Sequence, residues 1–163
     1  MFAGRQPLEQ RESRANGVGL MGKQAESVVC AAGMRGRAAE FVTGITARSR
    51  LPLDYSVASL RVVDFLIDGL RKGGADEDRV RAPLTGLGAY VGEVLVRRAG
   101  AEWVDLDATQ RAYFGQEVGV RMPDGRVWNP LGKVLNRFGS SGPEDSLQTF
   151  YLTLHGRSRR TAA

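Results

Sequence analysis

Glu93 and Arg97 carry the clearest chemical signal in the sequence, because two charges stand four residues apart within an otherwise apolar segment. In a helix this spacing brings the acid and the base to one face, in the order that favours an ion pair. A charge in apolar surroundings usually has a specific partner. The spacing therefore favours an ion pair, and it leaves open a charged binding site flanked by Tyr90 and Trp103.

Two other acidic pairs could support chemistry, and each has a simpler explanation. Asp105 and Asp107 follow a predicted strand and point the same way if the chain is extended, so they could act as an acid and a base. A polar strand end explains them equally well. Asp64 and Asp68 share one helix face and could hold a divalent ion, but an arginine three residues from each favours a salt-bridged face.

Residue counts and motifs exclude several classes of site. His155 is the one histidine and Cys30 the one cysteine, which excludes an internal disulfide and any metal site that needs two imidazoles. Gly86, Gly88 and Gly92 do not form a dinucleotide fingerprint, because the last glycine falls one residue late and a charged segment precedes them. We therefore predict no catalytic residue, no metal and no cofactor.

Aromatic residues near the charged pair could line a binding groove. Tyr90, Tyr113, Trp103 and Trp128 are the candidates, although ordinary core packing is the favoured explanation for at least half of them. The predicted binding set combines some of these aromatic residues with the charged pair: Tyr90, Glu93, Arg97, Trp103 and Trp128.

The elements that must position these residues follow from hydrophobic periodicity. A helix ending at Gly73 has a core stripe, namely Leu60, Val63, Leu66, Ile67 and Leu70. Residues 75–82 are predicted to form a charged loop, and a second, central helix is predicted from about Pro83 to Arg98. Strands are predicted at 101–106, 117–122 and 126–128, with a tight turn at Pro123-Asp124-Gly125 between the last two. Asn129 is predicted to cap a short helix at 131–138, and a last helix begins near Pro143.

These elements predict an α+β fold with two longer helices, a small antiparallel sheet of about three strands and two short C-terminal helices. The charges divide the chain further. Residues 1–50 hold eight basic and four acidic side chains and are predicted to be a basic N-terminal arm, partly helical or disordered. Residues 51–155 hold twelve basic and fourteen acidic side chains and form the predicted single domain, and residues 156–163 form a basic tail. A cytoplasmic location is expected, because the chain has no pair of cysteines.

Several segments of the sequence resemble a known family. Residues 53–56 read Leu-Asp-Tyr-Ser, and residues 88–95 read Gly-Ala-Tyr-Val-Gly-Glu-Val-Leu; Trp103, Val127 and Pro130 continue the pattern. Over about residues 51–154 the chain resembles a family of small uncharacterised bacterial domains, mainly from actinobacteria. The resemblance supports the domain boundaries and implies no particular activity.

The favoured hypothesis is therefore a non-enzymatic cytoplasmic protein that binds another protein, because the sequence lacks a catalytic set. The alternative is a small-ligand binder or enzyme that uses Glu93 with Arg97, or Asp105 with Asp107, and it predicts a pocket around these groups. A weaker alternative is nucleic-acid association through the basic ends of the chain, which predicts a steep salt dependence. No membrane-spanning segment is expected.

Overall fold

The computed structural model describes residues 28–161, except for the side chains at 77 and 157–161. Residues 1–27 of the predicted arm and residues 162–163 of the predicted tail lie outside the described residues. The elements in chain order are α1 Ala31–Thr46, α2 Leu60–Lys72, α3 Glu77–Ala99, β1 Glu102–Asp105, α4 Ala108–Phe114, β2 Val118–Arg121, β3 Val127–Trp128, α5 Pro130–Gly139, the 3-10 turn η1 Pro143–Asp145, and α6 Leu147–Thr161.

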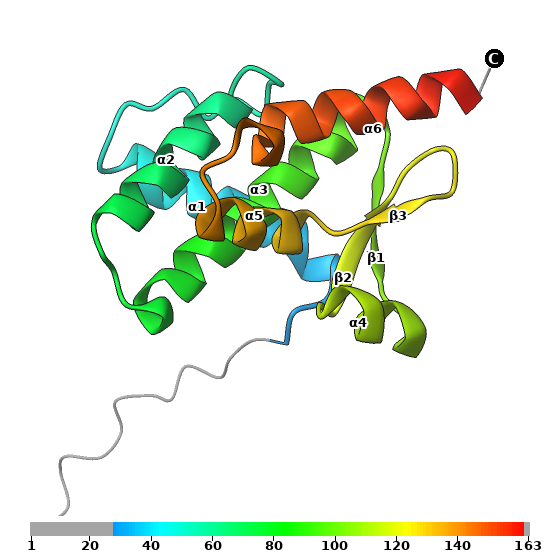
Figure 1. Ribbon diagram of the computed structural model, residues 1–163, viewed down its shortest axis with the longest axis horizontal. Coiled ribbons are helices and arrows are strands. Elements are labelled where there is room, and N and C mark those ends of the chain that lie inside the picture. Colours follow the sequence, from blue (N-terminus) through cyan, green and yellow to red (C-terminus); the bar gives the residue numbers. More distant parts are fainter. Residues whose placement is uncertain (1–27, 162–163) are drawn as a thin grey trace, which may run out of the picture.

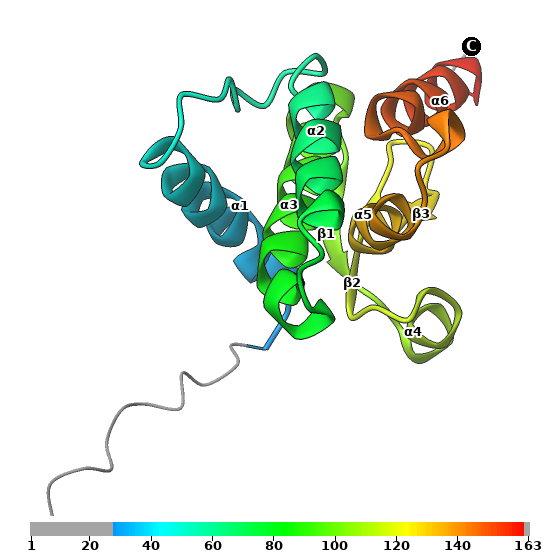
Figure 2. The same cartoon turned by 60° about the vertical axis from the view of Figure 1, so that its left-hand side comes forward.

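Helix α3 lies at the centre of the fold. Figure 1 labels these elements, and Figure 2 shows α1 on one side of α3 and α5 and α6 on the other, with the sheet beside them. The strand order is β1-β2-β3, antiparallel throughout. The predicted α+β class is thus confirmed. Among the described helices, none is long and apolar enough to cross a membrane.

The burial of α2 follows its predicted apolar stripe, and α3 is buried more extensively. In α2, Leu60, Val63 and Ile67 are fully buried, whereas Phe65 on the opposite face is 66% exposed. In α3, every residue from 87 to 95 is buried. This continuous burial explains why the segment around Glu93 is otherwise apolar.

Helix α3 begins at Glu77, so the charged loop predicted over residues 75–82 is wrong in its larger part. Pro83 lies inside the helix rather than at its first turn. A proline in a helix costs one backbone hydrogen bond and some strain. Burial of Val80 and Leu84, at 1% and 3% exposure, stabilises the added turns and offsets that cost.

Two glycines let neighbouring elements approach α3 closely. A Cβ at Gly88 would lie 2.9 Å from the backbone Cα of Leu131 in α5, and a Cβ at Gly92 would collide with the ring of Trp103 in β1. Glycine lowers helix propensity by roughly 1 kcal/mol relative to alanine. Here the missing side chains make room for a helix and for an aromatic ring.

The hairpin between β2 and β3 was predicted from residues 123–125, whereas α4 was not predicted. Asp107 precedes α4, and its carboxylate accepts a hydrogen bond from Gln110 N at 2.8 Å. The Gln110 side chain in turn accepts from Asp107 N at 3.0 Å. This reciprocal arrangement is a capping box, and the Asp-Ala-Thr-Gln sequence was its available signal.

Helix α1 packs against α3, although the predicted domain boundary at residue 51 placed this segment in the N-terminal arm. Met34 and Ala38 are fully buried in a cluster with Ala89, Val118 and Leu131. The Asp105 carboxylate accepts a hydrogen bond from Ala31 N at 2.8 Å and thereby ties the start of α1 to the end of β1. The packed core therefore begins before residue 51, and α6 continues beyond residue 155 to Thr161.

The aspartates of α2 hold a buried arginine. Arg137 of α5, at 7% exposure, donates from Nε to Asp64 Oδ1 at 3.1 Å and from Nη2 to Asp68 Oδ2 at 2.9 Å. Asp68 also pairs with Arg71, as its spacing predicted. Arg61 instead donates to Gln148 of α6. The charges on this face thus join α2 to α5 and α6.

Candidate functional site

Glu93 is a buried carboxylate within a cluster of aromatic and basic side chains. It is 2% exposed. Arg97, one turn later, donates from Nε to Oε1 at 3.0 Å, and the indole N–H of Trp103 donates to Oε2 at 3.4 Å. The close approach that Gly92 permits brings the indole of Trp103 to this carboxylate. Both oxygens therefore have a partner inside the protein.

A second contact fixes Arg97 from another side. Its guanidinium carbon lies 3.7 Å from the ring centroid of Tyr55, in a cation–π contact. The Tyr55 ring stacks in turn on Tyr90, with centroids 4.7 Å apart. Tyr90 is fully buried, whereas 39% of the Arg97 side chain is exposed. The stack therefore runs from the core to the surface and ends in a guanidinium group.

Tyr55 has an unusual backbone conformation, with φ at +58°. A tyrosine in the left-handed region is uncommon, and the surrounding contacts must hold it there. Tyr55 N donates to the Tyr90 hydroxyl at 2.9 Å, and Arg98 Nε donates to Tyr55 O at 2.9 Å. The Tyr90 hydroxyl also shares a hydrogen bond with Ser59 Oγ at 2.6 Å.

Burial also affects the ionisation of both tyrosines. It raises the pKa of Tyr55, against a smaller opposing effect of the Arg97 charge. Burial likewise raises the pKa of Tyr90, although hydrogen bonds to Ser59 and Tyr55 act in the opposite direction. Burial therefore makes ionisation of both hydroxyl groups less favourable than that of a tyrosine in water.

Arg35 of α1 brings a second guanidinium to the same carboxylate. Its Nε lies 4.0 Å from Glu93 Oε1, the oxygen that Arg97 Nε contacts. The Arg35 side chain is 80% exposed. One buried negative charge therefore faces two arginines, and the cluster of these three groups has one positive charge in excess.

The structure brings four of the five predicted binding residues together. Tyr90, Glu93, Arg97 and Trp103 form one cluster, in which the first two are buried. Trp128 lies on the same face of the sheet, since both tryptophans are register partners of Val120. Its ring, however, packs edge-on against Phe150 of α6, 6.3 Å between centroids.

Sequence reasoning did not select three residues of this cluster. Tyr55 lies in the Leu-Asp-Tyr-Ser segment, which was noted for the family resemblance and was not included in the predicted binding set. Arg98 follows Arg97 directly, but its hydrogen bond to the loop residue Tyr55 depends on the tertiary fold. Arg35 had no signal, because α1 was not placed against α3.

The alternative acid–base pair consists of residues with structural roles. Asp105 accepts the hydrogen bond from the first residue of α1, and Asp107 caps α4. Each carboxylate thus stabilises a helix N-terminus. Tyr113, a further aromatic candidate, is 83% exposed and lies edge-on against Phe114 within α4.

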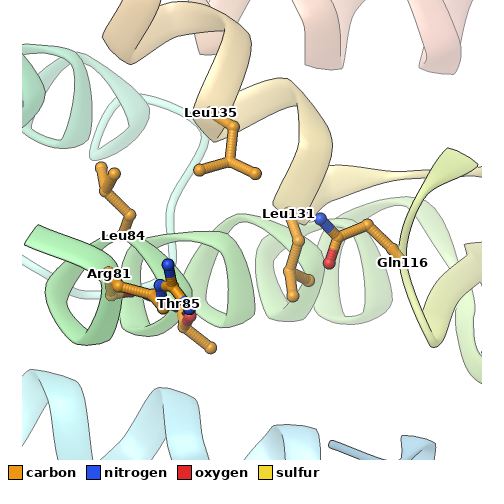
Figure 3. Close-up of a pocket in the computed structure, with 6 residues that line it drawn as sticks. All are labelled: Arg81, Leu84, Thr85, Gln116, Leu131 and Leu135. Atoms are coloured by element: carbon orange, nitrogen blue, oxygen red, sulfur yellow. Dashed lines mark hydrogen bonds between the residues drawn. The ribbon is translucent and has the colours of Figure 1, made fainter. Parts of the chain in front are cut away.

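A cavity of about 340 Å³ lies away from Glu93, between α3 and α5 (Figure 3). Its lining is Arg81, Leu84, Thr85, Gln116, Leu131 and Leu135. The pocket that the enzyme hypothesis predicts around Glu93 or the Asp105 pair is thus not this cavity. Within the described residues, no group of three or more histidine, cysteine, aspartate or glutamate side chains could hold a metal ion.

Comparison with known proteins leaves the resemblance noted above as a prediction. No protein-family model, no curated protein and no solved structure matches the chain.

Proposed function

We propose that the protein is a non-enzymatic module that binds another protein in the cytoplasm. Its contact surface consists of the exposed parts of Arg35, Tyr55 and Arg97, called the arginine–tyrosine surface below. Arginine and tyrosine are enriched among the residues that dominate binding energy at protein interfaces.

The fixed position of the Arg97 side chain is the observation that most supports this proposal. Its guanidinium group is held by Glu93 at 3.0 Å and by the Tyr55 ring at 3.7 Å, yet 39% of the side chain remains exposed. A long side chain normally loses conformational freedom on binding, at a cost of about 0.5–1.5 kcal/mol. A braced arginine has lost part of that freedom in the folded protein, which favours recognition.

The geometry favours binding over acid–base catalysis at Glu93. A general acid or base must come within hydrogen-bond reach of its substrate. Glu93 is 2% exposed, and both of its oxygens contact protein donors. A substrate would have to displace Arg97 or Trp103 to reach the carboxylate, whereas a partner can contact Arg97 directly.

Selection from a random-peptide display library against the full chain tests the proposal. We expect a set of related peptides to be enriched and to bind with micromolar affinity. Arg97→Gln should weaken their binding at least about tenfold, as for an interface arginine that contributes 1.4 kcal/mol or more. Arg35→Gln is the second variant, because a side chain that is 80% exposed can be changed without disturbing the core.

Arg79→Gln is the matched control. Arg79 is an exposed arginine on the same helix, eighteen positions before Arg97 and hence about 27 Å away along the axis. It should leave peptide binding unchanged. The proposal fails if no peptide is enriched, or if the enriched peptides bind both surface variants as tightly as the unmodified chain. Preferential, steeply salt-dependent binding of a random oligonucleotide would support the nucleic-acid alternative instead.

A further inference from the structure

We infer that the arginine–tyrosine surface contains a subsite for one carboxylate group, carried by an acidic side chain of the partner protein. This inference rests on the proposed function and specifies its chemistry. Three features of the cluster support it: the free edge of Arg97, the unbalanced charge and the accessibility of Arg35.

Arg97 presents hydrogen-bond donors that the protein does not use. Its contacts in the described structure are the Nε hydrogen bond to Glu93 and the ring contact with Tyr55. Within the described residues, its two terminal nitrogens therefore have no acceptor. A planar guanidinium edge matches the two oxygens of a carboxylate, and such paired hydrogen bonds are stronger than those between neutral groups.

The charge around this edge attracts a single anion. Arg35 and Arg97 approach the same oxygen of Glu93, so one of the two positive charges lacks a counter-charge. Nearby, Arg98 Nε donates to Tyr55 O at 2.9 Å. Hydrogen bonds to Ser56 and, as a smaller effect, the Arg98 charge lower the pKa of Asp54. One excess positive charge corresponds to one carboxylate.

Accessibility makes the subsite reachable without rearrangement of the core. The Arg35 side chain is 80% exposed and lies 4.0 Å from Glu93, beyond hydrogen-bond distance, so it is free to turn toward an incoming anion. Arg97 stays fixed between Glu93 and Tyr55. Arg97 as the rigid arginine that orients the carboxylate and Arg35 as the exposed arginine that turns toward it would form the complete subsite.

Acetate is the smallest probe of this chemistry. The ¹⁵N-labelled full chain is titrated with sodium acetate in place of sodium chloride, so that the ionic strength stays constant. The Nε–H resonances of Arg35, Arg79 and Arg97 are followed by NMR spectroscopy. We expect a saturable shift at Arg97 and Arg35 with a midpoint on the order of 10 mM, since one partly exposed charge contact is weak. Arg79 should not shift saturably.

Two variants and two further probes separate the outcomes. Arg97→Gln should abolish saturation at Arg35, and Arg35→Gln should raise the Arg97 midpoint roughly two- to fivefold, the range for one exposed charge contact. Acetamide, the neutral analogue, should have no effect. The inference is overturned if chloride or acetamide reproduces the shift, or if the shift grows linearly. Inorganic phosphate binding tenfold more tightly than acetate would also overturn it, by assigning the subsite to phosphate.

The two proposals can fail separately. If acetate gives no saturable shift while selected peptides still depend on Arg97, the carboxylate subsite is wrong and the protein-binding surface stands. If acetate saturates the subsite but no peptide binds, the subsite exists and the proposed function is wrong.

Discussion

Replacement of Glu93 by glutamine tests whether the buried carboxylate braces the cluster. The change keeps the shape of the side chain and removes its charge. A hydrogen bond that involves a charged group contributes roughly 1.5–3 kcal/mol when it is buried. The contact between Glu93 and Arg97 should contribute less than this range, because the Arg97 side chain is 39% exposed and can be solvated after the change.

The other two contacts add little to this magnitude. The indole of Trp103 lies at 3.4 Å, a long hydrogen bond, and Arg35 at 4.0 Å is mostly exposed. We therefore expect Glu93→Gln to lower the free energy of unfolding by about 1–2 kcal/mol. For a protein of this size that corresponds to a fall in Tm of roughly 2–8 °C.

Urea denaturation at pH 7, followed by far-ultraviolet circular dichroism, measures the effect. Glu102→Gln is the control, since Glu102 and Arg121 form an exposed ion pair, with side chains 63% and 50% exposed. The loss of stability in Glu102→Gln should stay within about 0.5 kcal/mol and disappear in 1 M salt, where charges are screened beyond about 3 Å. The loss at Glu93 should persist in 1 M salt.

An unchanged or higher stability of the Glu93→Gln protein would refute this reasoning. Buried ion pairs can be replaced without loss when desolvation outweighs their attraction. That result would mean that the Tyr55 stack alone holds Arg97, and the brace assigned to Glu93 would be wrong.

Further predictions concern packing, capping and pH. Gly92→Ala should destabilise the fold by about 1–3 kcal/mol in urea denaturation, since the added methyl group overlaps the Trp103 ring. Gly36→Ala should instead stabilise the fold by about 0.5–1 kcal/mol, because a Cβ at this position meets nothing within 4 Å. Asp105→Ala should speed hydrogen exchange in the first turn of α1, and unchanged exchange there would show that this cap is unimportant. Tyr90 has a raised pKa in the folded state, so its contribution is complete below its unfolded value of about 10 and is lost as the pH rises further. Tyr90→Phe should therefore lower stability at pH 8 and make the decline between pH 9 and 11 shallower in urea titrations, and an unchanged slope would contradict the assignment.

The sequence predicted the helices and strands that have strong periodicity or strong turn residues. The apolar stripe of α2, the hairpin at Pro123-Asp124-Gly125 and the Asn129 cap of α5 were all local signals, and local signals survive in the fold. The start of α3 was missed because tertiary burial of Val80 outweighed the local effect of a proline.

The candidate site was predicted in part for the same reason. Glu93 and Arg97 are neighbours on one helix, so their pairing is visible in the sequence. The contacts of Tyr55 and Arg35 depend on how a loop and another helix pack, and α1 buries few residues, chiefly Met34 and Ala38. A helix with so small a buried face leaves little periodicity to find.

The glycines of α3 also have an evolutionary consequence. Because the Trp103 ring occupies the space beside Gly92, neither position can change in size alone without disturbing the packing. Any natural sequence that adopts this fold should therefore vary the two sites jointly, with a larger residue at 92 only where 103 is smaller. Such covariation would preserve the alignment of the first strand along the central helix while the surface diverges.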